Sequence, residues 1–183
     1  MIFSLFGSGL GGGKFGLRKI LFKVFILITL SITFAQSEEL KKIGTFKDWE
    51  AILVYKESGK HCFAHSKPIL QLPKKGDREA RLFVSFWPED KISDQVSTTS
   101  GYEFNTQNSI TATSGRSKFK FDLPQGNFAW MSSNKNEKKI VKKMKRASRL
   151  MITGYNQSGS QTKDQYSLMG FTKAYNAAKK SCK

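Results

Sequence analysis

The chain has 183 residues and a formal net charge of +17, with 31 lysines and arginines against 14 aspartates and glutamates. Such an excess of positive charge favours binding to anionic surfaces. With two cysteines, two histidines and no CxxC pair, the chain lacks the usual ligands of a structural zinc site, and we predict neither a metal nor a cofactor.

Residues 1–35 are predicted to be an export signal. An uncharged run, Val24–Phe34, follows a basic segment and ends at Ala35, so cleavage is expected between Ala35 and Gln36. The alternative is an anchor that stays attached, but the run is shorter than the about 18 apolar residues a span requires. Cleavage would lower the charge from +17 to +13, because the segment carries four basic residues and no acid. These are Lys14, Arg18, Lys19 and Lys23.

An exported protein of this charge has a restricted set of partners. Export argues against nucleic acid and favours anionic envelope lipid, lipopolysaccharide or polysaccharide, with envelope proteins as further candidate partners. We expect a periplasmic, outer-membrane-associated or secreted protein of a Gram-negative cell, with peripheral rather than integral membrane association. The two cysteines, Cys62 and Cys182, lie beyond the predicted cleavage site. An oxidising compartment favours a disulfide between them, and the alternative is two buried free thiols.

After a loose lead-in at residues 36–45, residues 46–183 are predicted to form one domain of short strands. The run 118–123 alternates strictly and places Phe119, Phe121 and Leu123 on one face. Many short strands with regular turn signals favour an all-β antiparallel sandwich. The predicted strands are 49–55, 60–64, 81–87, 95–99, 109–113, 118–123, 127–131, 150–155 and 161–168.

Two helices are predicted within this sandwich, at residues 136–147 and 171–182. The first holds the densest charge in the chain, and we predict that its basic face binds an anionic surface. The alternative is an amphipathic helix packed on a sheet, with its lysines simply solvated. A thin apolar stripe argues against deep membrane insertion. The candidate binding residues are Lys138, Lys139, Lys142, Lys143, Lys145 and Arg146.

No catalytic motif is present, and we predict that the protein is not an enzyme. His61 and His65 flank Cys62, but a disulfide would remove the thiol from any nucleophile–base pair. Asp164 is the carboxylate most worth testing as an acid or base, although capping of a hairpin is the favoured role. The aromatic residues, Trp49, Trp87 and Trp130 among them, are predicted to form the core rather than a ligand groove.

The C-terminal segment from Gly154 to Phe171 resembles the invasion-associated locus B family of envelope proteins. The resemblance is carried by the run Asp164-Gln165-Tyr166-Ser167-Leu168-Met169-Gly170-Phe171 and by the final Cys182. Within the segment, Gly154 and Gly159 are predicted to turn the chain. The resemblance implies an immunoglobulin-like sandwich, a disulfide between the equivalents of Cys62 and Cys182, and no catalytic residues. The sequence therefore predicts an exported interaction module. The alternatives are a small cell-wall or glycan hydrolase using carboxylates near Asp164, and a scaffold or chaperone subunit in outer-membrane assembly.

Overall fold

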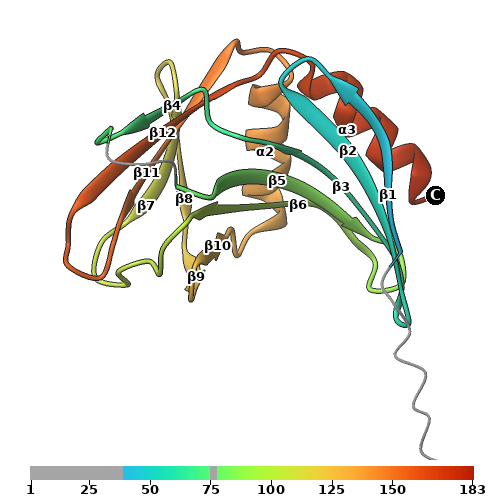
Figure 1. Ribbon diagram of the computed structural model, residues 1–183, viewed down its shortest axis with the longest axis horizontal. Coiled ribbons are helices and arrows are strands. Elements are labelled where there is room, and N and C mark those ends of the chain that lie inside the picture. Colours follow the sequence, from blue (N-terminus) through green and yellow to red (C-terminus); the bar gives the residue numbers. More distant parts are fainter. Residues whose placement is uncertain (1–38, 75–77) are drawn as a thin grey trace, which may run out of the picture. The chain divides into compact units, whose positions relative to one another are not determined.

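Two antiparallel sheets form the part of the chain that the computed structural model describes, residues 39–74 and 78–183 (Figure 1). The strands are β1 (Glu39–Phe46), β2 (Trp49–Lys56), β3 (Gly59–Ser66), β4 (Leu70–Leu72), β5 (Ala80–Trp87), β6 (Ile92–Ser100), β7 (Ile110–Ser114), β8 (Ser117–Phe121), β9 (Leu123–Gln125), β10 (Phe128–Trp130), β11 (Arg149–Tyr155) and β12 (Gln161–Ser167). The larger sheet has the order β1-β2-β3-β5-β6-β10-β9, and the smaller has β4-β12-β11-β7-β8. The predicted signal and its cleavage site lie outside the described residues.

Successive residues of a strand point to opposite faces, and one face of each sheet lies in a shared core. In β5, Leu82 and Val84 are fully buried, while the intervening Phe83 is half-buried on the opposite face. In the smaller sheet, Leu150 and Ile152 of β11 are buried in the same way. The prediction of an all-β antiparallel sandwich with two helices is confirmed.

The prediction of a loose lead-in at residues 36–45 is wrong from Glu39 onward. Residues 39–46 form β1, which pairs with β2 from Glu39 opposite Tyr55 to Phe46 opposite Trp49. The strand was missed because it is an edge strand whose first four residues, Glu39 to Lys42, are all exposed. An edge strand exposed in this way does not need the apolar alternation by which strands are recognised.

The run 118–123, predicted as one strand, is divided between the two sheets. Strand β8 belongs to the smaller sheet and β9 to the larger, and the chain passes between them at Asp122. The Asp122 carboxylate accepts hydrogen bonds from the backbone nitrogen of Ser132 at 2.8 Å and from its hydroxyl at 2.5 Å. These bonds fix the crossing point.

Helix α2 (Asn134–Met144) packs on β6, and α3 (Phe171–Ser181) packs across β1, β2 and β3. Figure 1 shows both helices on the same side of the bent seven-stranded sheet. Compared with the predicted helix at 136–147, α2 begins two residues earlier, at Asn134, and ends three residues earlier, at Met144. No helix in the described part of the chain is long and apolar enough to cross a membrane.

The C-terminal helix is held at both of its ends. At its start, the Phe171 and Trp49 rings meet edge to face with centroids 4.8 Å apart. Gly170 has a φ of +91°, and a Cβ there would lie 1.8 Å from the carbonyl oxygen of Phe46, so only glycine fits. At its end, Cys182 forms a disulfide with Cys62 of β3, which confirms the predicted pairing.

Gly154 does not turn the chain as predicted. It lies within β11, where a Cβ would come within 2.8 Å of the Tyr102 hydroxyl and 2.9 Å of the Phe104 ring. The absence of a side chain makes room for these aromatic rings. Gly159, in the hairpin that follows, has a φ of +79° and fits the predicted turn role.

Candidate functional site

The predicted basic helix presents only positive charge to solvent. Its apolar residues Ile140, Val141 and Met144 are buried against the body of the protein. The one acid in α2 is Glu137, which is 4% exposed and accepts a hydrogen bond from the Val96 backbone nitrogen at 3.0 Å. The exposed basic residues are Lys135, Lys138, Lys139, Lys142, Lys145 and Arg146, and Lys143 is half-buried.

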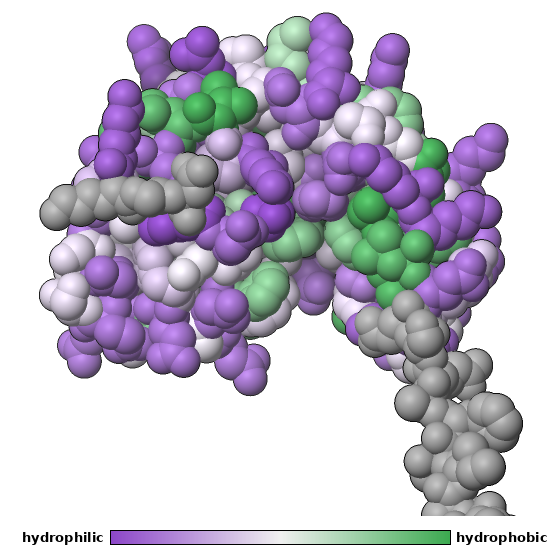
Figure 2. Space-filling model, in the orientation of Figure 1, coloured by the Kyte–Doolittle hydropathy of each residue, from purple (hydrophilic) through white to green (hydrophobic). Residues whose placement is uncertain are grey.

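The second helix extends this cationic character. Helix α3 contains no acidic residue, and its Lys173 and Lys180 are exposed. We call the exposed basic residues of α2, of the turn directly after it and of α3, apart from Lys145, the helix surface: Lys135, Lys138, Lys139, Lys142, Arg146, Lys173 and Lys180. Figure 2 shows long hydrophilic side chains projecting from the margin of the molecule along which α3 lies. Lys135, Lys173 and Lys180 were not predicted as binding residues, because they lie outside the continuous run of basic residues at 138–146.

Lys145 differs from the other predicted binding residues because it joins the two helices. Its Nζ lies 3.7 Å from the centre of the Tyr175 ring in α3, a cation–π contact. The Lys179 Nζ donates to the Tyr175 hydroxyl at 3.3 Å, and that hydroxyl donates to Asp94. Partial burial lowers the pKa of Lys145. Lys145 therefore serves packing between the helices, so we leave it out of the helix surface.

Glu137 allows the effect of one buried charge in α2 on stability to be tested. Burial raises the pKa of its carboxyl above the ordinary value of about 4.5. When folding raises the pKa of an acid, the group contributes fully to the stability of the protein at a pH below its ordinary pKa. This contribution is lost as the pH rises through the pKa of the folded state. Glu137→Gln keeps an oxygen for the Val96 N–H and carries no charge. We therefore expect a higher melting temperature than wild type at pH 7 and an equal one at pH 4.

Thermal unfolding of Glu137→Gln at the two pH values measures this difference. Lys139→Gln, on the exposed side of the same helix, is the control and should unfold like wild type at both. A lower melting temperature for Glu137→Gln at pH 7 would show that the buried charge supports the fold.

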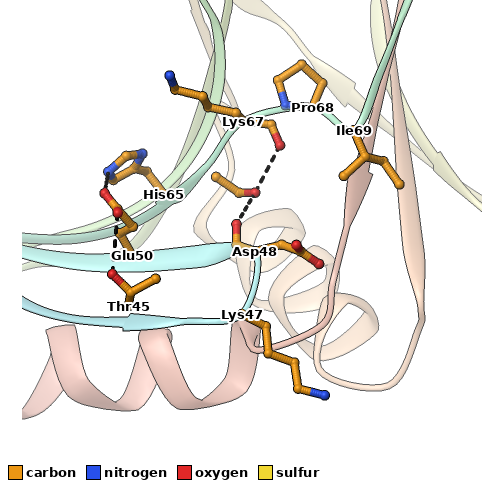
Figure 3. Close-up of a pocket in the computed structure, with 9 residues that line it drawn as sticks. Thr45, Lys47, Asp48, Glu50, His65, Lys67, Pro68 and Ile69 are labelled. Atoms are coloured by element: carbon orange, nitrogen blue, oxygen red, sulfur yellow. Dashed lines mark hydrogen bonds and ion pairs between the residues drawn. The ribbon is translucent and has the colours of Figure 1, made fainter.

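A polar pocket of about 420 Å³ opens beside the β1–β2 turn (Figure 3). Figure 3 shows Glu50 next to His65, with Thr45 on the other side of the carboxylate. The Glu50 Oε2 lies 3.4 Å from the His65 Nε2, and a hydrogen bond from Lys42 lowers the pKa of Glu50. The Ser66 hydroxyl donates to the Asp48 carbonyl at 2.5 Å, so it is not directed at the imidazole.

The two histidines do not activate Cys62. Alternation along β3 places His61 and His65 on the face opposite to Cys62, whose sulfur is bonded to Cys182. The His61 ring stacks on Trp87 with centroids 3.5 Å apart, and burial lowers the pKa of His65. Among the described residues, no three His, Cys, Asp or Glu side chains are grouped so as to hold a metal ion.

Asp164 is an internal residue, and the prediction that it caps a hairpin is wrong. It lies within β12 with a side chain that is 1% exposed. Arg78 binds both of its carboxylate oxygens, at 2.5 and 3.1 Å, and also donates to the Ser100 carbonyl at 2.8 Å. A carboxylate held in this way is not accessible to a substrate, so the geometry gives no support to a hydrolase that uses it.

The prediction that the tryptophans form the core holds only for Trp49, which is fully buried. Trp87 and Trp130 are half-buried on the other face of the seven-stranded sheet, away from the helices. Trp130 stacks on Phe128 with ring centroids 5.5 Å apart. The prediction rested on residue type alone, whereas alternation along β5 places Trp87 on the face opposite to the buried Leu82 and Val84.

Comparison with known proteins identifies the family. No curated protein and no solved structure gave a significant match. The model of the family described as "Invasion associated locus B (IalB) protein" matches residues 49–179, which run from the first residue of β2 almost to the end of α3. Since this match covers well over half of the sequence, the chain belongs to the invasion associated locus B family.

Proposed function

We propose that the protein is an exported, non-enzymatic module of the cell envelope that binds anionic lipid, lipopolysaccharide or polysaccharide through the helix surface. One observation carries this proposal. In α2 and α3 every exposed charge is positive, and the one acid of the two helices, Glu137, is buried. Solvated surfaces usually mix both signs of charge, so a single sign over two adjoining helices favours an anionic partner.

The packing of α2 determines how such binding would work. Its apolar residues Ile140, Val141 and Met144 are used in the core. They are therefore not available to enter a bilayer, and attraction between charges is the main force left. This attraction decays over a Debye length, about 8 Å at physiological ionic strength, so binding should be peripheral and strongly dependent on salt.

An extracytoplasmic location fits both the family and the Cys62–Cys182 disulfide, because disulfides persist in oxidising compartments. The partners proposed here are all components of that compartment or of a host surface. Export by the predicted signal segment remains part of the proposal.

Neutralising the helix surface should weaken binding to anionic vesicles. The variant carries Lys138→Gln, Lys139→Gln, Lys142→Gln and Arg146→Gln, four exposed positions whose change leaves the core intact. We expect a loss on the order of 1000-fold in partition onto vesicles of phosphatidylglycerol and phosphatidylcholine, since each of the four basic residues near an anionic surface contributes about 1 kcal/mol. Vesicle co-sedimentation at low and physiological salt measures it.

A matched control removes the same amount of charge elsewhere, through Lys41→Gln, Lys67→Gln, Lys74→Gln and Lys91→Gln, all exposed and outside both helices. It should lose less than tenfold. Equal losses in the two variants would mean that net charge alone is recognised. Unchanged binding of the helix variant would show that the helix surface has been assigned wrongly.

A further inference from the structure

The outer face of the five-stranded sheet carries a second polar surface that the helix surface does not include. The register places Thr153 of β11 between Thr111 of β7 and Lys163 of β12, and Thr113 of β7 opposite Lys118 of β8. Since directly paired residues point to the same side of a sheet, these five side chains share one face. The buried residues between them, such as Ile152 and Ala112, face the core.

This face is hollowed into an open basin of about 350 Å³. Thr111, Thr113 and Thr153 lie between Lys118 on one side and Lys163 on the other. Strands β12 and β8 are separated by two strands, which is about 14 Å of sheet at the usual inter-strand spacing. That width accommodates a sugar ring between the two lysines.

The threonines and lysines of the basin have no side-chain partner within the described residues, 39–74 and 78–183. The hydroxyls of Thr111, Thr113 and Thr153 make no hydrogen bond there, and Lys118 and Lys163 make no ion pair with any described acid. Among the described residues, those that line the basin include no acidic side chain.

The larger sheet shows the usual alternative, in which outward-facing charges pair with one another. There, Lys42 pairs with Glu50, and Arg81 pairs with Glu79 at 2.8 Å. The lysines of the basin lack such partners in the described chain, so an anion from outside would be their first counter-charge.

One end of the basin is formed by an ordered aromatic ring. The Gln161 Nε2 donates to the Tyr155 hydroxyl at 2.6 Å, across a register pair of β11 and β12. A half-buried tyrosine held in this way offers a flat apolar surface beside hydroxyls and cations. Sugars present the same combination of an apolar ring face and hydroxyl groups.

We infer that this basin binds an anionic sugar, a carboxylated or phosphorylated unit of an envelope or host polysaccharide. The ring would lie against Tyr155, its hydroxyls would bond to the threonines, and Lys118 and Lys163 would bind the anionic group. The site goes beyond the helix surface, because a shaped basin selects a ring whereas the helices select charge alone. It does not depend on the helix surface being correct.

Titration calorimetry with four probes tests the inference: trigalacturonate, glucose 6-phosphate, neutral maltotriose and inorganic phosphate. We expect at least one anionic sugar to bind at least tenfold more tightly than both maltotriose and inorganic phosphate. The two anionic arms show whether the carboxylate or the phosphate is preferred. Failure of both anionic sugars to bind, or equal binding of inorganic phosphate, would overturn the assignment.

Variants then locate the binding. We expect binding of the anionic sugar to weaken at least tenfold in the double variant Lys118→Gln with Lys163→Gln, and at least tenfold in the single variant Thr153→Val. The control variant Lys41→Gln should bind it within twofold of wild type. All four positions are on strands, so thermal unfolding is recorded for each variant. Unchanged binding by the double lysine variant would contradict the site. The helix variant should bind the anionic sugar like wild type. Loss of sugar binding and loss of vesicle binding therefore test the basin and the helix surface separately.

Discussion

Removal of the Cys62–Cys182 disulfide should lower the free energy of unfolding by about 5 kcal/mol, the largest effect expected of any change considered for this protein. The bridge joins residues 120 positions apart in the sequence. Opening it releases almost the whole described chain from a closed loop and so raises the entropy of the unfolded state. A loss of this size is a large fraction of the stability of an ordinary domain.

The effect on the folded state should be confined to the end of α3. Phe171 and Tyr175 still anchor the helix through the aromatic contacts with Trp49 and Phe86. The last turn, which ends at Cys182 on β3, loses its covalent attachment. We therefore expect an unchanged strand signal in circular dichroism and faster amide hydrogen exchange near Lys180.

Urea unfolding of wild type, with and without reductant, and of the variant Cys62→Ala with Cys182→Ala measures this contribution. Reductant should destabilise the wild type to the level of the double variant and should leave the double variant unchanged. A difference below 1 kcal/mol between oxidised and reduced wild type would show that the bridge adds little. Intact mass after alkylation reports whether the thiols are bonded in the purified protein.

Loss of Arg78 should be the next most damaging change. Arg78→Met leaves the Asp164 carboxylate, which is 1% exposed, without its cation, and removal of one partner from a buried ion pair costs about 3–5 kcal/mol. The backbone around Arg78 is held independently, because the Gln71 side-chain amide bonds both its nitrogen, at 3.0 Å, and its carbonyl, at 3.1 Å. The substitution therefore tests the charge rather than the path of the chain.

The pair formed by Arg81 and Glu79 provides a matched control. Its N–O distance is 2.8 Å, but the Glu79 side chain is 80% exposed. Arg81→Met should cost no more than about 1 kcal/mol, as is usual for exposed pairs. Adding Asp164→Asn to Arg78→Met should recover part of the loss, because the buried charge is then removed. Equal losses in the Arg78 and Arg81 variants would contradict the account of the buried pair.

Local patterns predicted most of the fold. Short apolar runs located β5 and β11, and helical spacing located α3. Strand β1 was missed because its exposed, charged start carries no such pattern. Strands β4 and β9 were missed because each is three residues long, and β9 contains Pro124.

The candidate sites depended on contacts that local patterns do not contain. The lysines of α2 were evident from charge, but the capture of Lys145 by Tyr175 depends on the packing of two helices separated in the sequence. The Arg78–Asp164 pair joins residues 86 positions apart. Similarly, the basin requires Lys118 and Lys163 to be brought to one face by the register of four strands.

The most direct test of the central claim is a map of where an anionic ligand contacts the protein. Isotope-labelled protein is titrated with small bicelles containing phosphatidylglycerol, and amide chemical shifts are followed by NMR. The proposal predicts changes concentrated in residues 134–146 and 171–180, reversed by salt, with little change in the five-stranded sheet. Changes centred instead on the outer face of the seven-stranded sheet, around Trp87 and Trp130, with α2 and α3 unaffected, would contradict it.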